Sequence, residues 1–187
     1  MTETVQQQII ISGVGGQGVL FVTRLMAEAA IARELPVLTS ETHGMAQRGG
    51  TVISHLKVGD FASPLIRHGR ADGMLALKAE SVVQFEGFVK SGGWIVANSA
   101  VPLETDHQIE TFVADADQVA TALENPKAVN LVMLGYCLAN TTGNRHTAKS
   151  SYMTMDRIVT VLETRFKARK DILTASLAAL EAGFKLR

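Results

Sequence analysis

The chain alternates between two hydrophobic patterns, which predict strands and helices in turn. Short apolar runs bounded by turn residues predict buried strands, and apolar residues that recur at helical spacing predict amphipathic helices. Strands are expected over residues 7–12, 36–40, 51–58, 61–66, 74–77, 94–97 and 109–113. Helices are expected over residues 18–33, 80–90, 116–123, 127–140, 150–166 and 170–182.

This alternation predicts an α/β fold with three layers, a Rossmann-like, doubly wound domain whose sheet is mostly parallel. A turn at Gly59 predicts an antiparallel hairpin between residues 51–58 and 61–66. The C-terminal third is expected to be helical, with Gly183 ending the last helix as its C′ residue. The chain has 187 residues and no internal repeat or linker, so residues 1–187 are expected to form a single domain.

The charge balance and the lengths of the apolar runs exclude some classes of binding partner. Lys and Arg together number 18, as do Asp and Glu, so no net charge attracts the chain to nucleic acid or to an anionic membrane. The first eight residues are polar and no apolar run is long enough for a membrane span, which needs about 18 residues. We therefore expect a cytoplasmic protein without nucleic-acid or membrane partners.

The chain contains one cysteine, Cys137, within an apolar helical run. One thiol cannot form an internal disulfide, and an iron–sulfur cluster needs about four cysteine ligands. Cys137 is expected to be a buried structural thiol. No histidine spacing indicates a metal site and no Gly-x-Ser-x-Gly motif indicates a nucleophile, so no metal ligand or catalytic residue is predicted. Redox chemistry would need a centre carried elsewhere.

The most informative motif is a glycine turn between the first strand and the first helix. Gly13, Gly15 and Gly18 have the G-x-G-x-x-G spacing that lets a backbone approach a phosphate at a helix N-terminus. One interpretation is an anion cradle built from these glycines with Gly16 and Gln17, holding the phosphates of coenzyme A or a nucleotide. The other is a tight turn that only packs the strand on its helix. Both interpretations stay open at this point.

Glu41 follows Gly18 by 23 residues, near the position where dinucleotide-binding domains keep a ribose-binding acid. This spacing raises the alternative of a stand-alone NAD- or FAD-binding oxidoreductase. However, a loop follows Glu41 where a second helix would be expected, so the mononucleotide-binding unit is incomplete. A nucleotide-binding module without chemistry is a third hypothesis.

The loop after Glu41 holds a second glycine signal, Arg48-Gly49-Gly50. A planar guanidinium suits bidentate contacts to carboxylate or phosphate, and flanking glycines leave backbone amides accessible. Arg48 is therefore a candidate for substrate or partner contact, the alternative being an arginine that braces the loop. His43 and Gln47 on the same loop are candidate hydrogen-bonding residues. We expect this loop at the carboxyl edge of the strands, covered by a partner.

Another basic feature lies between the last two predicted helices. Arg165, Lys167, Arg169 and Lys170 are close together there, and the interpretation favoured is a solvated turn over a phosphate or partner site. Arg24 is expected on the outward side of the first helix.

Together, residues 13–18 and 41–54 resemble the gamma-type domain of the 2-oxoacid:ferredoxin oxidoreductases. The run His-Gly-Met-Ala-Gln-Arg-Gly-Gly at 43–50 is most similar to the small (beta) subunit of the indolepyruvate oxidoreductases. The likeness continues at residues 63–66, 71–72, 92–93, 130–135 and 175–184.

The resemblance implies a subunit that is inactive alone. In this family a 2-oxoacid is oxidatively decarboxylated on thiamine diphosphate, electrons pass through iron–sulfur clusters to ferredoxin, and coenzyme A takes the acyl group. The resemblance then implies that thiamine diphosphate, Mg²⁺ and the clusters are bound by a large partner subunit. Any contact of this chain with coenzyme A would be shared with that subunit. This chain would contribute interface and part of the substrate or coenzyme A channel. A homodimer of the isolated chain is left open.

Overall fold

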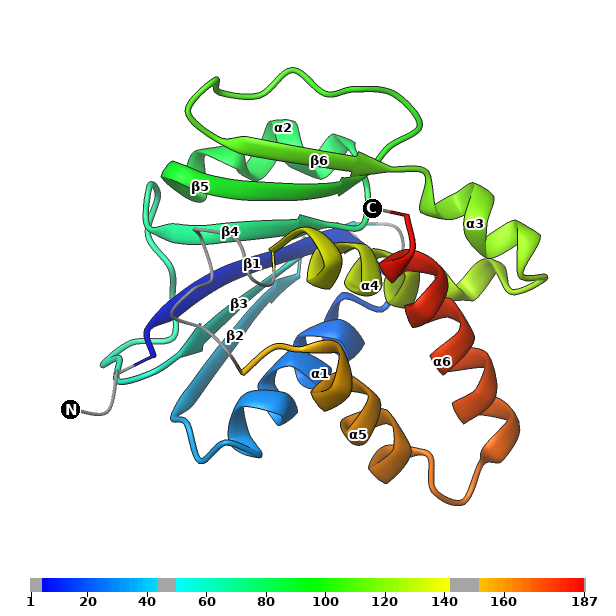
Figure 1. Ribbon diagram of the computed structural model, residues 1–187. Helices are drawn as coiled ribbons and strands as arrows, with labels where there is room; N and C mark the ends of the chain where they lie inside the picture. The colour runs from blue at the N-terminus through cyan, green and yellow to red at the C-terminus, as the bar shows by residue number, and fades with distance from the viewer. Residues whose placement is uncertain (1–4, 44–49, 142–151, 187) are drawn as a thin grey trace.

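A mixed sheet of six strands forms the centre of the computed structural model, which describes residues 5–43, 50–141 and 152–186. The strand order is β2-β3-β1-β4-β5-β6 (Figure 1). The strands are β1 (Gln7–Val14), β2 (Val37–His43), β3 (Thr51–Val58), β4 (Ala71–Ala76), β5 (Val89–Asn98) and β6 (Glu110–Ala114).

Strand direction divides the sheet at β1. The pairs β1–β4, β4–β5 and β5–β6 are parallel, whereas β3 runs antiparallel to both β1 and β2. After β1 the chain crosses through the first helix to β2 at one edge, while β4 lies on the other side of β1. Connections that diverge from one strand leave a crevice at its carboxyl end, where α/β proteins bind ligands. The predicted α/β class, mostly parallel with an antiparallel part, is confirmed.

The predicted hairpin is wrong in its second strand, because residues 61–66 form no strand. Both edges of β3 are already occupied, by β1 on one side and β2 on the other, so a returning segment has no free edge to pair with. Side chains of β3 hold this segment instead. His55 Nδ1 accepts a hydrogen bond from the Ile66 N–H at 3.2 Å, and Lys57 Nζ lies 5.0 Å from the ring centre of Phe61.

Helices cover both faces of the sheet, as the three-layer prediction requires, but unequally (Figure 1). The strands alternate between two cores: Ile9 and Ile11 of β1 belong to the larger core, whereas Ile10 belongs to the smaller. The larger core lies under α1 (Val19–Ile31), α3 (Ala116–Ala122), α4 (Val129–Thr141), α5 (Met155–Arg165) and α6 (Lys170–Phe184). The smaller core lies under α2 (Glu80–Phe85) and a 3-10 turn, Glu86–Phe88.

Helix α4 is buried along its whole length, and α6 packs directly against it. Glycine lies on each side of this contact. A Cβ on Gly135 would overlap the Leu180 carbonyl oxygen, and a Cβ on Gly183 would overlap the Val132 carbonyl oxygen. The prediction that Gly183 ends the last helix is wrong, because α6 continues through it to Phe184. Gly183 is where two helix backbones meet.

Two other predicted helix boundaries move inward. Residues 89–90 belong to β5, so the helix predicted over 80–90 ends at Phe85 and passes through the 3-10 turn. The helix predicted from residue 150 begins at Met155, after Thr154 in an extended conformation. Residues 150–151 lie outside the described residues.

Cys137 is fully buried on α4, as predicted for a structural thiol. Burial raises the pKa of its thiol to about 12, although a contact between its Sγ and Thr141 Oγ1 at 3.9 Å opposes the shift. The thiolate form is therefore scarce at neutral pH. In the part of the chain that the structure describes, no helix is both long enough and apolar enough to cross a membrane.

Stability should fall at mildly acidic pH because of His55. Burial first, and then the charge of Lys57, lower the pKa of this histidine below its usual value of about 6.5. A lowered folded-state pKa means that the neutral ring contributes stability above ~6.5, which is lost as the pH falls through the folded pKa. We expect the free energy of unfolding, measured in urea from pH 8 to pH 5, to fall with a slope contribution of at most about 1.4 kcal/mol per pH unit.

His55→Asn provides the matched comparison, because its side-chain oxygen can accept from the Ile66 N–H but does not titrate. The variant should lose part of the pH slope. An identical slope in both proteins would assign the pH dependence to other groups.

Candidate functional site

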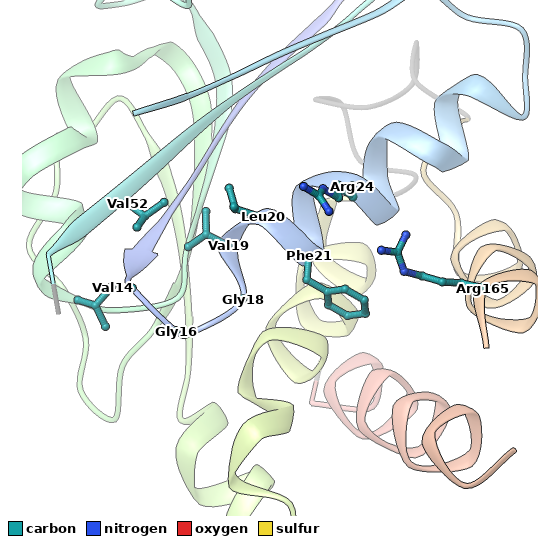
Figure 2. Close-up of a pocket in the computed structure, with 10 residues that line it drawn as sticks. Val14, Gly16, Gly18, Val19, Leu20, Phe21, Arg24, Val52 and Arg165 are labelled. Atoms are coloured by element: carbon teal, nitrogen blue, oxygen red, sulfur yellow. The ribbon is translucent and has the colours of Figure 1, made fainter. Parts of the chain in front are cut away.

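A pocket of about 430 Å³ opens at the carboxyl end of β1, where the sheet connections diverge (Figure 2). The glycine turn and the first turns of α1 form one side. Val52 of β3 and Arg165 of α5 complete the lining. The lining residues are Val14, Gly15, Gly16, Gly18, Val19, Leu20, Phe21, Arg24, Val52 and Arg165.

Two glycines of the turn have left-handed backbones, with φ of 97° at Gly16 and 84° at Gly18. Gly18 is the N-cap of α1, where no side chain caps the helix and no acidic residue occupies the first turn. The first backbone N–H groups of a helix have no partner within it and carry the positive end of its dipole. An anion in the pocket would meet these N–H groups.

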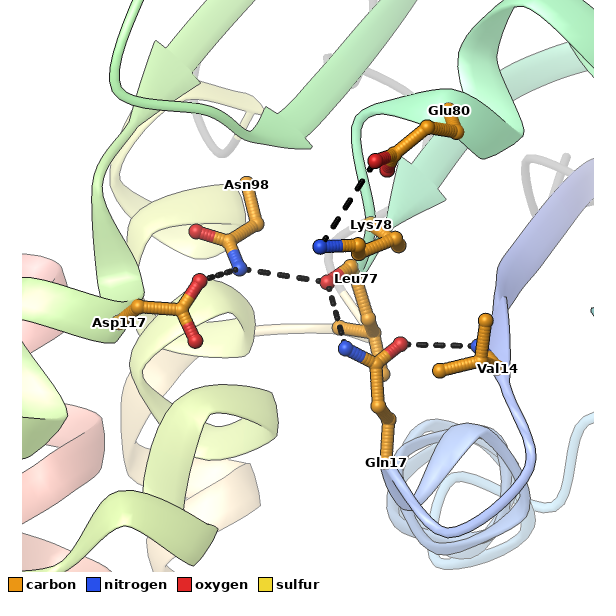
Figure 3. A network of polar contacts seen from close by, with 7 residues as sticks. All are labelled: Val14, Gln17, Leu77, Lys78, Glu80, Asn98 and Asp117. Carbon is orange, nitrogen blue, oxygen red and sulfur yellow. Dashed lines mark hydrogen bonds and ion pairs between the residues drawn. The ribbon is translucent and has the colours of Figure 1, made fainter. Parts of the chain in front are cut away.

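Gln17 does not line the pocket and instead bonds the turn to Leu77, the residue that follows β4 (Figure 3). The Val14 N–H donates to Gln17 Oε1 at 2.8 Å, and Gln17 Nε2 donates to the Leu77 carbonyl at 3.3 Å. A Cβ on Gly13 would lie 2.8 Å from the same Gln17 oxygen. The geometry therefore supports a packing role for Gly13 and Gln17, while Gly15, Gly16 and Gly18 line the pocket.

The hydrogen bonds that hold the glycine turn continue to β5 through Asn98. Asn98 Nδ2 donates both to the Leu77 carbonyl at 3.3 Å and to Asp117 Oδ2 at 2.8 Å, and Asn98 Oδ1 accepts from the Ala116 N–H at 2.9 Å (Figure 3). One asparagine thus ties the carboxyl end of β5 to β4 and to α3. The Leu77 carbonyl thus accepts from both Gln17 and Asn98, which links the glycine turn to β5 and α3.

Two arginines that sequence reasoning did not assign to the site supply its positive charge (Figure 2). Arg165 extends from α5 toward α1, where its Nη1 pairs with Glu28 Oε1 at 2.6 Å and its guanidinium carbon lies 5.6 Å from the ring centre of Phe21. Arg24 lines the same pocket and has no hydrogen-bond or ion-pair partner among the described residues. Arg165 is exposed at the last residue of α5, as the solvated-turn interpretation expects, and it also lines the pocket.

The second glycine motif reaches the first through its final residue. The Gly15 N–H donates to the Gly50 carbonyl at 3.0 Å. The backbone of His43 pairs with Val52 at the end of β2, so both flanks of the connecting loop lie at the sheet edge that carries the pocket. Gln47, Arg48 and Gly49 lie outside the described residues, as does the His43 side chain.

Glu41 lies on β2, paired in register with Ser54, and is exposed. It is not part of the pocket lining. Across residues 5–43, 50–141 and 152–186, no three His, Cys, Asp or Glu side chains gather as metal ligands would.

Comparison with known sequences extends over nearly the whole chain. The family model described as "Pyruvate ferredoxin/flavodoxin oxidoreductase" matches residues 8–186. Indolepyruvate oxidoreductase subunit IorB of Archaeoglobus fulgidus is 43% identical over 91 residues, 49% of this chain and 45% of that protein. Subunit IorB of Thermococcus kodakarensis is 28% identical over 160 residues, 74% of this chain and 79% of that protein. The match thus spans under half of the Archaeoglobus protein.

Two solved structures share the fold. The 2-oxoglutarate:ferredoxin oxidoreductase of Magnetococcus marinus, determined with 2-oxoglutarate, coenzyme A and succinyl-CoA bound, aligns with a TM-score of 0.77 at 20% identity, over 97% of this chain and 31% of that one. The gamma subunit of a keto/oxoacid ferredoxin oxidoreductase from Geobacter sulfurreducens aligns with a TM-score of 0.73 at 22% identity, over 96% of both chains.

Proposed function

The chain belongs to the pyruvate ferredoxin/flavodoxin oxidoreductase family, and from this membership we propose that it is the small, cluster-free subunit of a 2-oxoacid:ferredoxin oxidoreductase of the indolepyruvate type. Membership also confirms the resemblance inferred from the two glycine motifs. In the proposed reaction an aryl or other 2-oxoacid is oxidatively decarboxylated to an acyl-CoA while ferredoxin is reduced. We assign residues 1–187 to one gamma-type domain of that cytoplasmic complex.

The cofactors that this chain can bind indicate which of them must be bound by a partner subunit. Its single thiol, Cys137, is buried with a raised pKa, so it suits neither a cluster nor a nucleophilic step. We place thiamine diphosphate, Mg²⁺ and the iron–sulfur clusters on a large partner subunit, through which ferredoxin receives its electrons. When bound there, thiamine diphosphate supplies the carbanion stabilisation that decarboxylation needs.

The pocket beside the glycine turn is the part of this chain proposed to contact coenzyme A. The observation that carries the proposal is the pairing of the uncapped N-terminus of α1 with two arginines, one of them without a partner among the described residues. Phosphate groups match both features, because backbone N–H groups and guanidinium groups are anion donors. The related Magnetococcus marinus enzyme holds coenzyme A in its structure.

The end of β2 and the connection from it to β3 are proposed as the surface that meets the large subunit or the substrate. Its residues in this role are Glu41, His43, Gln47, Arg48, Gly49 and Gly50. The NAD- or FAD-enzyme alternative loses support, because Glu41 is exposed on β2 and does not line the pocket where a ribose would follow the phosphates.

Binding without turnover is the expected behaviour of the isolated chain. Calorimetric titration should show coenzyme A binding that Arg24→Ala weakens about ten-fold, the size of one lost charge-assisted hydrogen bond. Lys127→Ala removes the same charge from an exposed position outside the pocket and should have no effect.

The isolated chain should not decarboxylate any 2-oxoacid, and native protein should co-purify with a large, brown, thiamine-containing subunit. Robust turnover by the chain alone would contradict the subunit assignment.

A further inference from the structure

Arg165 separates two cavities. On one side lies the glycine-turn pocket, and on the other lies a second pocket of about 460 Å³ between α1 and α5. The second pocket is lined by Glu28, Ile31, Ala32, Thr160, Val161, Thr164 and Arg165. Arg165 is the residue common to both linings, and its ion pair with Glu28 joins the two helices across the boundary.

The charges on the two sides of Arg165 differ. The described residues that line the glycine-turn pocket include two arginines and no acid. Glu28, on the other side, is the acid that pairs with Arg165, at 2.6 Å from its Nη1. The pair is partly open to solvent, with the side chains 31% and 41% exposed, so it can be exchanged at modest free-energy cost.

The aromatic ring of Phe21 lies next to the guanidinium of Arg165. The guanidinium carbon of Arg165 lies 5.6 Å from the centre of this ring, and Phe21 itself lines the glycine-turn pocket. A guanidinium has five N–H donors in a planar fork. Arg165 lines the same pocket as the start of α1, and a carboxylate already holds it there.

We propose that Glu28 sets the affinity of the glycine-turn pocket by competing with the bound anion for Arg165. This inference rests on the proposed function, because it assumes that the pocket binds a phosphorylated ligand. When the anion enters, Arg165 exchanges Glu28 for phosphate oxygens, with Phe21 supporting the guanidinium in both positions. Arg165 thus helps to determine the affinity of the pocket, and it stays paired with Glu28 until an anion binds.

The test uses inorganic pyrophosphate as the probe and the full chain, titrated by calorimetry. Glu28→Gln should tighten binding about five-fold, the strength of a partly exposed ion pair. Glu163→Gln, which removes the same charge from an exposed position of α5 outside both linings, should leave binding unchanged. Arg165→Met keeps much of the apolar stem against Phe21 and should weaken binding about ten-fold.

The decisive measurement is the double variant, because competition and simple charge repulsion differ there. If Glu28 acts through Arg165, Glu28→Gln gives no gain in the Arg165→Met background. A five-fold gain that persists in that background overturns the inference. If wild type binds pyrophosphate and Arg24→Ala weakens it, but Glu28→Gln has no effect, the pocket stands and this inference fails. If neither wild type nor Glu28→Gln binds pyrophosphate, both the inference and the proposed anion pocket fail.

Discussion

Gly135→Ala and Gly183→Ala should each destabilise the chain by about 3 kcal/mol, the upper part of the range for overpacking. Helix propensity alone predicts the opposite sign, because alanine in a helix interior is favoured over glycine by about 1 kcal/mol. Packing outweighs propensity here. The new Cβ at Gly135 would lie 2.9 Å from the Phe184 nitrogen, and that at Gly183 would lie 2.7 Å from the Val132 carbonyl carbon. Both obstacles are backbone atoms that no rotamer change can move.

Urea unfolding followed by circular dichroism measures the effect. Gly87→Ala is the matched control, since it adds the same methyl group where the nearest atom, His68 Nδ1, is 3.3 Å away. The control should change the free energy of unfolding by no more than about 0.5 kcal/mol. Stabilisation by Gly135→Ala or Gly183→Ala would mean that α4 and α6 can separate without loss, contrary to the buried contact between them.

The misplaced end of α6 shows what a single sequence leaves open. A glycine after a periodic apolar run predicts a C′ cap, and the same pattern also fits a glycine needed for a close helix–helix contact. Only the position of α4 distinguishes the two, because the Val132 carbonyl lies where a Cβ of Gly183 would be. The alternation of apolar positions nevertheless predicted most of the strands and helices, since burial imposes period 2 or 3.6 locally.

The predicted hairpin failed for a related reason. Apolar alternation over 51–58 shows that a strand forms, but it does not show which neighbours occupy its two edges. Those neighbours are β2, the strand that directly precedes β3, and β1, which lies far from it in sequence. Pairing between distant strands is a property of the whole sheet, and a local pattern cannot reveal it.

Residues that line the pocket were predicted where they are consecutive in the sequence and missed where they are not. The glycine turn could be found because strand, turn and helix are consecutive in the sequence. Arg165 could not, because its role depends on α5 packing beside α1, and a basic residue near a helix end looks the same when it is merely solvated. Arg24 carried a weak signal, since it lies within two turns of Gly18 on the same helix.

Gly18→Ala is expected to reduce stability by about 3 kcal/mol and to weaken anion binding, whereas Gly16→Ala should reduce stability by only about 1 kcal/mol. Both glycines have left-handed backbones, with φ of 84° and 97°, so the conformational strain is similar. Their surroundings differ. A Cβ at Gly16 would meet nothing within 4 Å, but at Gly18 it would overlap the Asn130 amide, whose Cγ would be 3.2 Å away.

Comparing the two variants distinguishes backbone strain, which both share, from the contact with Asn130, which only Gly18→Ala makes. Asn130 belongs to the first turn of the buried helix α4, so moving its amide disturbs the position of α1 against α4 and with it the first N–H groups that face the pocket. Urea unfolding gives the stability difference, and pyrophosphate titration of both variants gives the effect on the site. Equal losses of stability would show that Asn130 yields freely, in which case the φ of the turn, and not its contact with α4, makes glycine necessary at residue 18.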